Sequence, residues 1–215
     1  MIFAVLGLGS NKSWGGLEPL ELLSHACFRL KKLFVSDFRV SSVYISKAMY
    51  LEDQADFHNM CVSGFTNLSA AELLRKIHQI ESSLGREREN ETRNGPRSID
   101  IDIELYGTEK IDFCDSKDKM KNLQIPHPRL QERAFVLLPL LDVLPKDSDI
   151  LNALQIRGWL SEIRKKDGHD GKSGRVKKLL CPADFEAMIK KAGENDGRLA
   201  GSDRFGSADF CSGKI

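Results

Sequence analysis

The stretch GPRSIDIDIEL, residues 95–105, alternates isoleucine with acidic residues. A period of two predicts a β-strand with one apolar and one polar face. The isoleucines would face a core, while Asp100 and Asp102 project side by side and Glu104 continues their face. The glycine and proline in front of the strand predict a turn that fixes where the preceding loop enters it.

The paired aspartates predict a site for a hard divalent cation, although such a pair also fits a solvated strand face. Two carboxylates on one face can bind the ion through oxygen, and without it they repel each other. The preceding loop favours the cation site, because its arginines suit phosphate and magnesium would bridge phosphate to the carboxylates. These arginines are Arg86, Arg88, Arg93 and Arg97.

The common nucleotide-binding signatures do not fit this sequence. Residues 7–13 read GLGSNKS, which lacks the glycine before lysine of a P-loop and the third glycine of a dinucleotide fingerprint. We therefore expect any ATP to be held by arginines and metal. His127 and Arg133 are candidates for an opposite wall of such a site, and the amide of Asn59 suits the edge of a heterocycle.

Outward from residues 95–105, strands alternate with helices. We expect strands at 2–8, 38–45, 57–65 and 98–106, and helices at 17–33, 69–84 and 134–143. Ser69 is a candidate N-cap of the second helix, which would end at Gly85. This order favours an α+β sandwich.

The chain has 215 residues, of which 41% are hydrophobic and 29% charged, and its net charge is +1. These values are typical of a globular protein and give no global field that would attract nucleic acid or a membrane surface. No apolar run approaches the roughly 18 residues that span a bilayer. The five cysteines are widely spaced, which favours reduced thiols and a cytoplasmic location.

We expect one domain over residues 1–165 and a C-terminal extension over residues 166–215. The composition changes near Lys165, and the extension is rich in glycine and lysine. It has few bulky apolar residues, so we expect it to be flexible or to hold one weak helix at 179–192, with Phe185 and Ile189 on one face.

In order and spacing, segments of residues 1–160 resemble the 6-hydroxymethyl-7,8-dihydropterin pyrophosphokinase family of folate synthesis. The most specific segment is Gly-Pro-Arg-x-x-Asp-x-Asp at 95–102; the others are 7–11, 53–59, 80–86 and 126–137. The resemblance implies an enzyme that transfers pyrophosphate from ATP to the hydroxymethyl group of the dihydropterin and releases AMP. It also implies a ferredoxin-like α+β sandwich, with helices flanking a central antiparallel sheet.

The resemblance further implies roles for individual residues. Asp100 and Asp102 resemble the ligands of two Mg²⁺ ions, and with Arg86 and Arg97 they form the expected catalytic set. The expected ATP-binding residues are Glu81, Arg86, Arg88, Arg97, His127 and Arg133. The expected pterin-binding residues are Ser46, Asn59, Asp100 and Phe135. We expect a monomer whose partners are ATP, as co-substrate, and a dihydropterin, with no nucleic acid and no membrane.

Two departures from the family stand out. Ser-Lys-Ala at residues 46–48 replaces a stretch that usually contains threonine and proline, and residues 166–215 lie outside the family pattern. Two other functions fit parts of the sequence. Another magnesium-dependent nucleotidyl or phosphoryl transferase would share the aspartates and arginines, but not a pocket for a planar ring. A ferredoxin-like RNA-binding module would need basic and aromatic residues on the face that carries Asp100 and Asp102.

Overall fold

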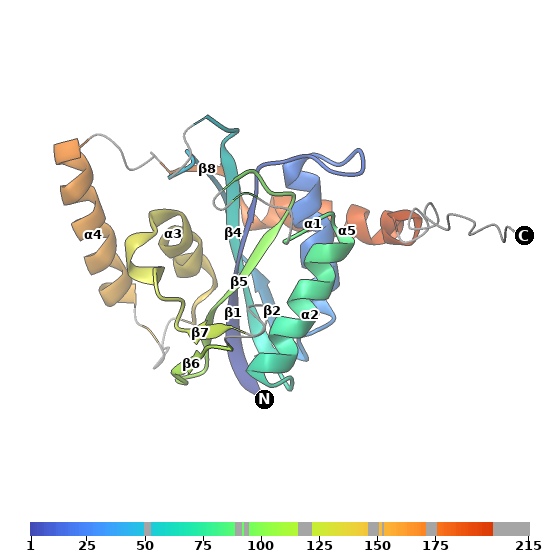
Figure 1. Cartoon of the computed structure of the whole chain (residues 1–215), viewed down its shortest axis with the longest axis horizontal. Helices are drawn as coiled ribbons and strands as arrows, with labels where there is room; N and C mark the ends of the chain where they lie inside the picture. Colours follow the sequence, from blue (N-terminus) through green and yellow to red (C-terminus); the bar gives the residue numbers. More distant parts are fainter. Residues whose placement is uncertain are drawn as a thin grey trace, which may run out of the picture.

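A central antiparallel sheet organises the chain, with strand order β5-β1-β4-β3-β8 and β2 also paired to β4 (Figure 1). The computed structural model describes residues 1–49, 53–88, 92, 95–115, 122–145, 151, 153–170 and 176–199. The strands are β1 (Ile2–Ser10), β2 (Ser36–Val40), β3 (Val43–Ser46), β4 (Phe57–Thr66), β5 (Asp100–Tyr106) and β8 (Lys177–Leu180).

Helices cover both faces of the sheet, which confirms the expected α+β sandwich (Figure 1). On one face lie α1 (Pro19–Lys31), α2 (Ala70–Ser83) and α5 (Pro182–Leu199); on the other lies α3 (Ala134–Val143), with α4 (Ala153–Asp170) outside it. Short strands β6 (Ile111–Phe113) and β7 (Leu123–Ile125) pair beside β5, and a 3₁₀ turn, η2 (Leu130–Glu132), leads into α3. None of the helices in the described ranges combines the length and hydrophobicity that a membrane crossing demands.

The pleat of β5 divides its side chains as the sequence predicts. Ile99, Ile101 and Ile103 are at most 4% exposed and belong to the core beneath α1 and α2. Asp100 and Asp102 face the opposite side and stay partly exposed. The end of α2 fixes the loop before β5: Gly85 follows the helix with φ of 82°, a left-handed conformation that glycine adopts without strain.

Several predicted elements differ from those in the structure. The strand expected at 38–45 is two strands, β2 and β3, on either side of Ser41 and Ser42; Ser42 N–H donates to Asp142 (3.0 Å). The sequence analysis did not predict α4, the β6–β7 pair or β8. In the extension, β8 pairs with β3, and α5 buries Phe185 completely in the core shared with α1.

Replacing Phe185 by alanine tests how far the extension stabilises the domain. Because the ring is fully buried, Phe185→Ala should lower the free energy of unfolding by about 3–5 kcal/mol. Urea denaturation measures this, with Leu179→Ala as the control, since Leu179 is 45% exposed. A Phe185→Ala protein as stable as the control would show that the extension adds no core.

Candidate active site

Two glycines of β1 make a floor between β4 and β5. Gly9 pairs with Asp100 on one side and with Asn59 on the other, and Gly7 pairs with Asp102 on the β5 side. Because paired residues of neighbouring strands point to the same face, both aspartates and Asn59 project from one side of the sheet. The glycines carry no side chain there, which leaves space above the backbone.

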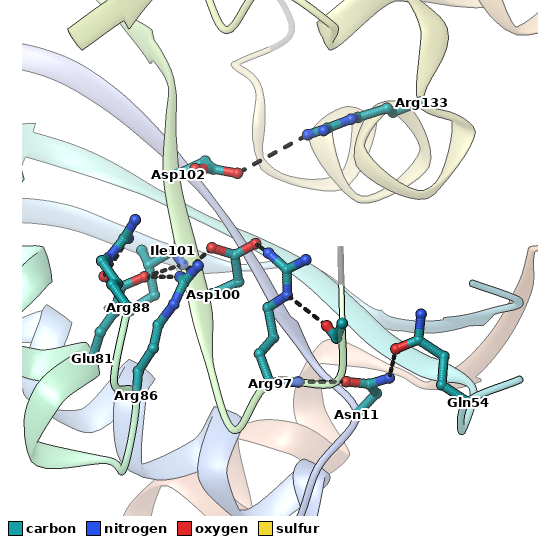
Figure 2. A network of polar contacts seen from close by, with 11 residues as sticks. Asn11, Gln54, Glu81, Arg86, Arg88, Arg97, Asp100, Ile101, Asp102 and Arg133 are labelled. Atoms are coloured by element: carbon teal, nitrogen blue, oxygen red, sulfur yellow. Dashed lines mark hydrogen bonds and ion pairs between the residues drawn. The ribbon is translucent and has the colours of Figure 1, made fainter. Parts of the chain in front are cut away.

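Asp100 is held by two arginines from the loop before β5. Arg86 Nη1 donates to its Oδ1, and Arg97 Nη1 donates to its Oδ2 at 2.5 Å (Figure 2). Burial by itself would raise the pKa of Asp100, but the two guanidinium groups outweigh it and keep the pKa well below its ordinary value. Asp100 is therefore a carboxylate at neutral pH.

Glu81 at the end of α2 ties these arginines to the sheet. Glu81 is 1% exposed. Its Oε1 accepts from Ile101 N–H (2.8 Å) and from Arg86 Nη1 (2.5 Å). Its Oε2 accepts from Arg88 Nη2 (2.5 Å) (Figure 2). One buried carboxylate thus links α2, the loop and β5. The role in ATP binding expected for Glu81 stays a prediction.

Asp102 has the opposite electrostatic environment. Its side chain is 39% exposed, and the described cation that approaches it is Arg133, with Nη1 to Oδ2 at 4.0 Å. Burial in the cleft and the neighbouring Asp100 carboxylate raise the pKa of Asp102 above its ordinary value. Burial and Asp102 likewise raise the pKa of Glu104 to about 8.

The donor set of Asp100 and Asp102 suits a hard divalent cation. Two carboxylates share one face, and their mutual repulsion is what a cation would relieve. Among the described residues no group of three or more histidine, cysteine or acidic side chains could hold a metal ion. The two carboxylates alone would leave coordination positions for a bound anion and water, as magnesium has with phosphate.

One cavity opens above this floor, on the side of α3. Its empty volume is about 790 Å³ including the mouth, and Gly7, Gly9 and both aspartates contribute to its wall. It combines the rings of Phe57 and Phe135 with polar groups, a composition typical of sites for planar heterocycles. The remaining lining residues are Leu8, Ser46, Lys47, Ala48, Met49, Gln54, Asn59, Met60, Arg97, Glu104, Arg133 and Val136.

Asn59 is fixed at the wall of this cavity. Its Nδ2 donates to Ser46 Oγ (3.0 Å) and to the Phe57 carbonyl (3.2 Å), and the side chain is 5% exposed. The amide oxygen therefore points over Gly9 toward the cavity as an acceptor. Ser46 lies at the end of β3 and is itself 4% exposed, so it orients Asn59 as well as lining the cavity.

Sequence reasoning missed two residues of this site. Phe57 lies two positions before Asn59 on the same strand face, a spacing that could have indicated it; Arg97 Cζ lies 5.9 Å from its ring centre. Asn11 joins three segments, because its Nδ2 donates to Gln54 Oε1 and the Ala55 carbonyl (both 3.0 Å) and its Oδ1 accepts from Arg97 N–H (2.9 Å) (Figure 2). No local pattern indicates that role.

A second cavity lies between α2 and the β6–β7 pair, and Asp102 lines both cavities. Arg88 and His127 line the second cavity, together with His78 of α2. His127 Nδ1 accepts from Arg129 N–H (3.1 Å), and burial together with the Arg133 charge lowers the pKa of His127 to about 4. The imidazole is therefore neutral near pH 7 and leaves Nε2–H as a donor.

The structure brings the predicted residues together around the aspartates. Ser46, Asn59, Arg97, Arg133 and Phe135 line the first cavity, and Arg88 and His127 line the second. Arg86 and Glu81 lie behind them, 9% and 1% exposed. Arg93 lies outside the described residues.

Comparison with known proteins identifies the family. Residues 5–145 match the family model of 7,8-dihydro-6-hydroxymethylpterin-pyrophosphokinase (HPPK). The chain is 45% identical over 140 residues to the 2-amino-4-hydroxy-6-hydroxymethyldihydropteridine pyrophosphokinase of Bacillus subtilis, covering 65% of this chain and 77% of that protein. It is 37% identical over 145 residues to the Aquifex aeolicus protein of the same name, covering 67% and 82%.

Longer proteins also match. The chain is 38% identical over 157 residues to a folate synthesis bifunctional protein of Arabidopsis thaliana, covering 73% of this chain but only 30% of that protein. The crystal structure of Plasmodium falciparum HPPK-DHPS with pteroate superposes with a TM-score of 0.55 at 17% identity, covering 78% of this chain and 43% of that chain. This structural similarity shows the shared fold.

Neutralising Glu81 should destabilise the protein strongly. Glu81→Gln keeps the shape but leaves the buried Arg86 without a charged partner on that side, which should cost about 3 kcal/mol in free energy of unfolding. Urea denaturation measures the change. Glu186→Gln, at an exposed position of α5, is the matched control and should change stability by less than about 0.5 kcal/mol. Equal effects in the two variants would contradict the network.

His127 should make stability depend on pH below neutrality. The unfolded chain binds a proton at His127 near pH 6.5, whereas in the folded protein the pKa of His127 is about 4. Unfolding is therefore favoured as pH falls from 6.5 toward 4. Relative to His127→Asn, the wild type should lose about 1 kcal/mol more between pH 7 and pH 5, allowing for partial exposure. Parallel urea titrations at both pH values test this, and identical losses would contradict it.

Proposed function

The chain belongs to the HPPK family, and we propose that it transfers the pyrophosphate group of ATP to 6-hydroxymethyl-7,8-dihydropterin in folate synthesis. The single observation that best supports this is the position of Asp102, which lines both cavities. One cavity suits a flat heterocycle, and the other carries arginine and histidine donors. A transfer between two bound substrates needs such adjacent sites with charge stabilisation between them.

The dihydropterin fits the cavity over the glycine floor. Phe57 and Phe135 offer ring faces for stacking, and the Asn59 amide oxygen accepts a hydrogen bond from an N–H at the ring edge. Ser46 orients Asn59 and contributes to the wall. With the ring in this cavity, the hydroxymethyl group lies toward Asp100, which positions its oxygen.

ATP takes the second cavity, with its phosphates directed at the aspartates. Arg88 and His127 line that cavity, and Arg86, Arg97 and Arg133 stand around Asp100 and Asp102. We assign Glu81 a positioning role, because its contacts are with two of these arginines and with the β5 backbone. From its buried position, Glu81 holds the guanidinium groups of Arg86 and Arg88 in place beside the aspartates.

Asp100 and Asp102 would hold two magnesium ions together with the ATP phosphates. Bound there, magnesium would neutralise negative charge on the phosphate oxygens. Asp100 accepts one hydrogen bond at each oxygen, from Arg86 and from Arg97, and each oxygen keeps a second lone pair that could bind a cation. A guanidinium displaced by the metal would become available to a phosphate oxygen.

The chemical step forms one bond and breaks one. The hydroxymethyl oxygen bonds to the β-phosphorus of ATP, and the bond from that phosphorus to the oxygen bridging it to the α-phosphorus breaks, so AMP leaves with that oxygen. The hydroxyl proton passes to solvent water as the new bond forms. The residues of this site orient the two substrates and stabilise charge, and no covalent enzyme intermediate is required.

We place the enzyme in the cytoplasm, as a monomer that binds neither nucleic acid nor membrane. The net charge of +1 and the acidic face of β5 support the exclusion of nucleic acid, because a nucleic-acid site needs a basic patch.

An assay for AMP tests the proposed function. The full chain is mixed with ATP, magnesium and 6-hydroxymethyl-7,8-dihydropterin, and wild type is compared with Asp102→Asn and with Glu186→Gln as a charge-matched control. We expect AMP formation that depends on the pterin, is unchanged in the control and falls by at least about 10²–10³-fold in Asp102→Asn. AMP formation by the wild type that ignores the pterin would instead support another phosphoryl or nucleotidyl transferase.

A further inference from the structure

Glu104 occupies an irregular position in β5. Leu6 of β1 pairs with Ile103, and the preceding Val5 pairs with Leu105, so Glu104 has no partner across the strands. It is the extra residue of a β-bulge. Bulges turn a side chain away from its regular direction and are common beside active sites.

The carboxyl group of Glu104 is buried without a full set of partners. The residue is 1% exposed, and its Oε2 is a buried atom with no hydrogen-bond partner in the described part of the chain. Its Oε1 lies over Gly7, where a Cβ atom would stand only 2.7 Å away. The carboxyl group therefore fits because residue 7 has no side chain.

The neighbours of Glu104 do not account for a buried acid. Among the described residues, the cation whose charge acts on it is Arg133, but the two form no ion pair within 4.0 Å, and the buried Arg133 Nε has no hydrogen-bond partner there either. Cys61, paired with Gly7 on β4, and Val136 of α3, which lines the same cavity as Glu104, belong to the apolar core on this side of the sheet. Burial of an unpaired polar group costs free energy, and an apolar side chain of the same size would avoid that cost.

Glu104 lies at the inner end of the cavity assigned to the pterin. It lines that cavity together with Gly7, Asp102 and Phe135. Along β5, Glu104 comes two residues after Asp102, in the direction away from Asp100. A ring that lies on the glycine floor, with its hydroxymethyl group at the aspartates, therefore ends near the free oxygen of Glu104.

Building on the proposed function, we infer that Glu104 is a specificity-determining residue whose carboxyl group hydrogen-bonds a polar edge atom of the dihydropterin ring at the inner end of the cavity. Bound pterin then supplies the partner that Oε2 lacks. The protein is less stable without ligand because the carboxyl group is kept for the substrate, a trade of stability for recognition.

Two substitutions separate a substrate contact from a structural role. Glu104→Met keeps the approximate size and removes both oxygens, whereas Glu104→Gln keeps a donor and an acceptor. The measurements are the Kd of 6-hydroxymethyl-7,8-dihydropterin in the presence of magnesium and a non-hydrolysable ATP analogue, the Kd of the analogue alone, and the thermal midpoint. Glu186→Met, on the exposed face of α5, is the matched control.

We expect Glu104→Met to raise the pterin Kd about tenfold or more, with the Kd of the ATP analogue unchanged and a thermal midpoint equal to or above that of the wild type. Glu104→Gln should stay within about threefold of the wild-type pterin Kd. Wild-type pterin affinity in Glu104→Met would overturn the inference, and so would a lower midpoint with equal weakening of both ligands. A wild-type protein that fails to bind pterin would instead defeat the proposed function on which the inference rests.

Discussion

The site depends on the pleat of one strand. In β5 the isoleucines are held in the core beneath α1 and α2. Because side chains alternate along a strand, the aspartates between them face the opposite side, where they line the cavities. A shift of one residue in the pairing register of β5 would bury both carboxylates in an apolar core and expose the isoleucines. Both changes would lower the free energy of unfolding. Core packing on one face of the sheet therefore sets the position of the charges on the other.

Charge compensation then explains the order of groups around the aspartates. Asp100 is balanced by Arg86 and Arg97, while among the described residues Asp102 has Arg133 alone, at 4.0 Å. One carboxylate is therefore stable without ligand and the other is not, which is visible in the opposite directions of their pKa shifts. The uncompensated charge lies at the junction of the two cavities, where a cation and a polyphosphate together would restore the balance.

The sequence predicted the elements with strong local signals. Ser69 caps α2 because its Oγ accepts from Glu72 N–H while the Glu72 carboxylate accepts from Ser69 N–H, as the pattern indicated. The alternation at 99–104 predicted β5, and with it the shared face of the aspartates. By contrast, β8 is only four residues long, and its sequence KKLL has no alternation that would predict a strand. It forms because the edge of β3 is available for pairing. The partners of Glu81 are likewise a product of tertiary structure, since nothing local shows which residues a helix end will meet.

The C-terminal extension, which lies outside the family pattern, pairs with the strand that leads to residues 46–48 of the site. β8 pairs with β3 up to Ile45 opposite Lys177, so it continues the sheet beyond the strand that ends in Ser46. Ser46 in turn accepts the hydrogen bond of Asn59, whose amide oxygen faces the first cavity. The stretch at residues 46–48 has no proline to stiffen it. β3 is instead paired on both sides, with β4 and with β8, and α5, which follows β8, packs Phe185 into the core. The strand that ends in Ser46 is therefore held by backbone pairing from the far end of the chain.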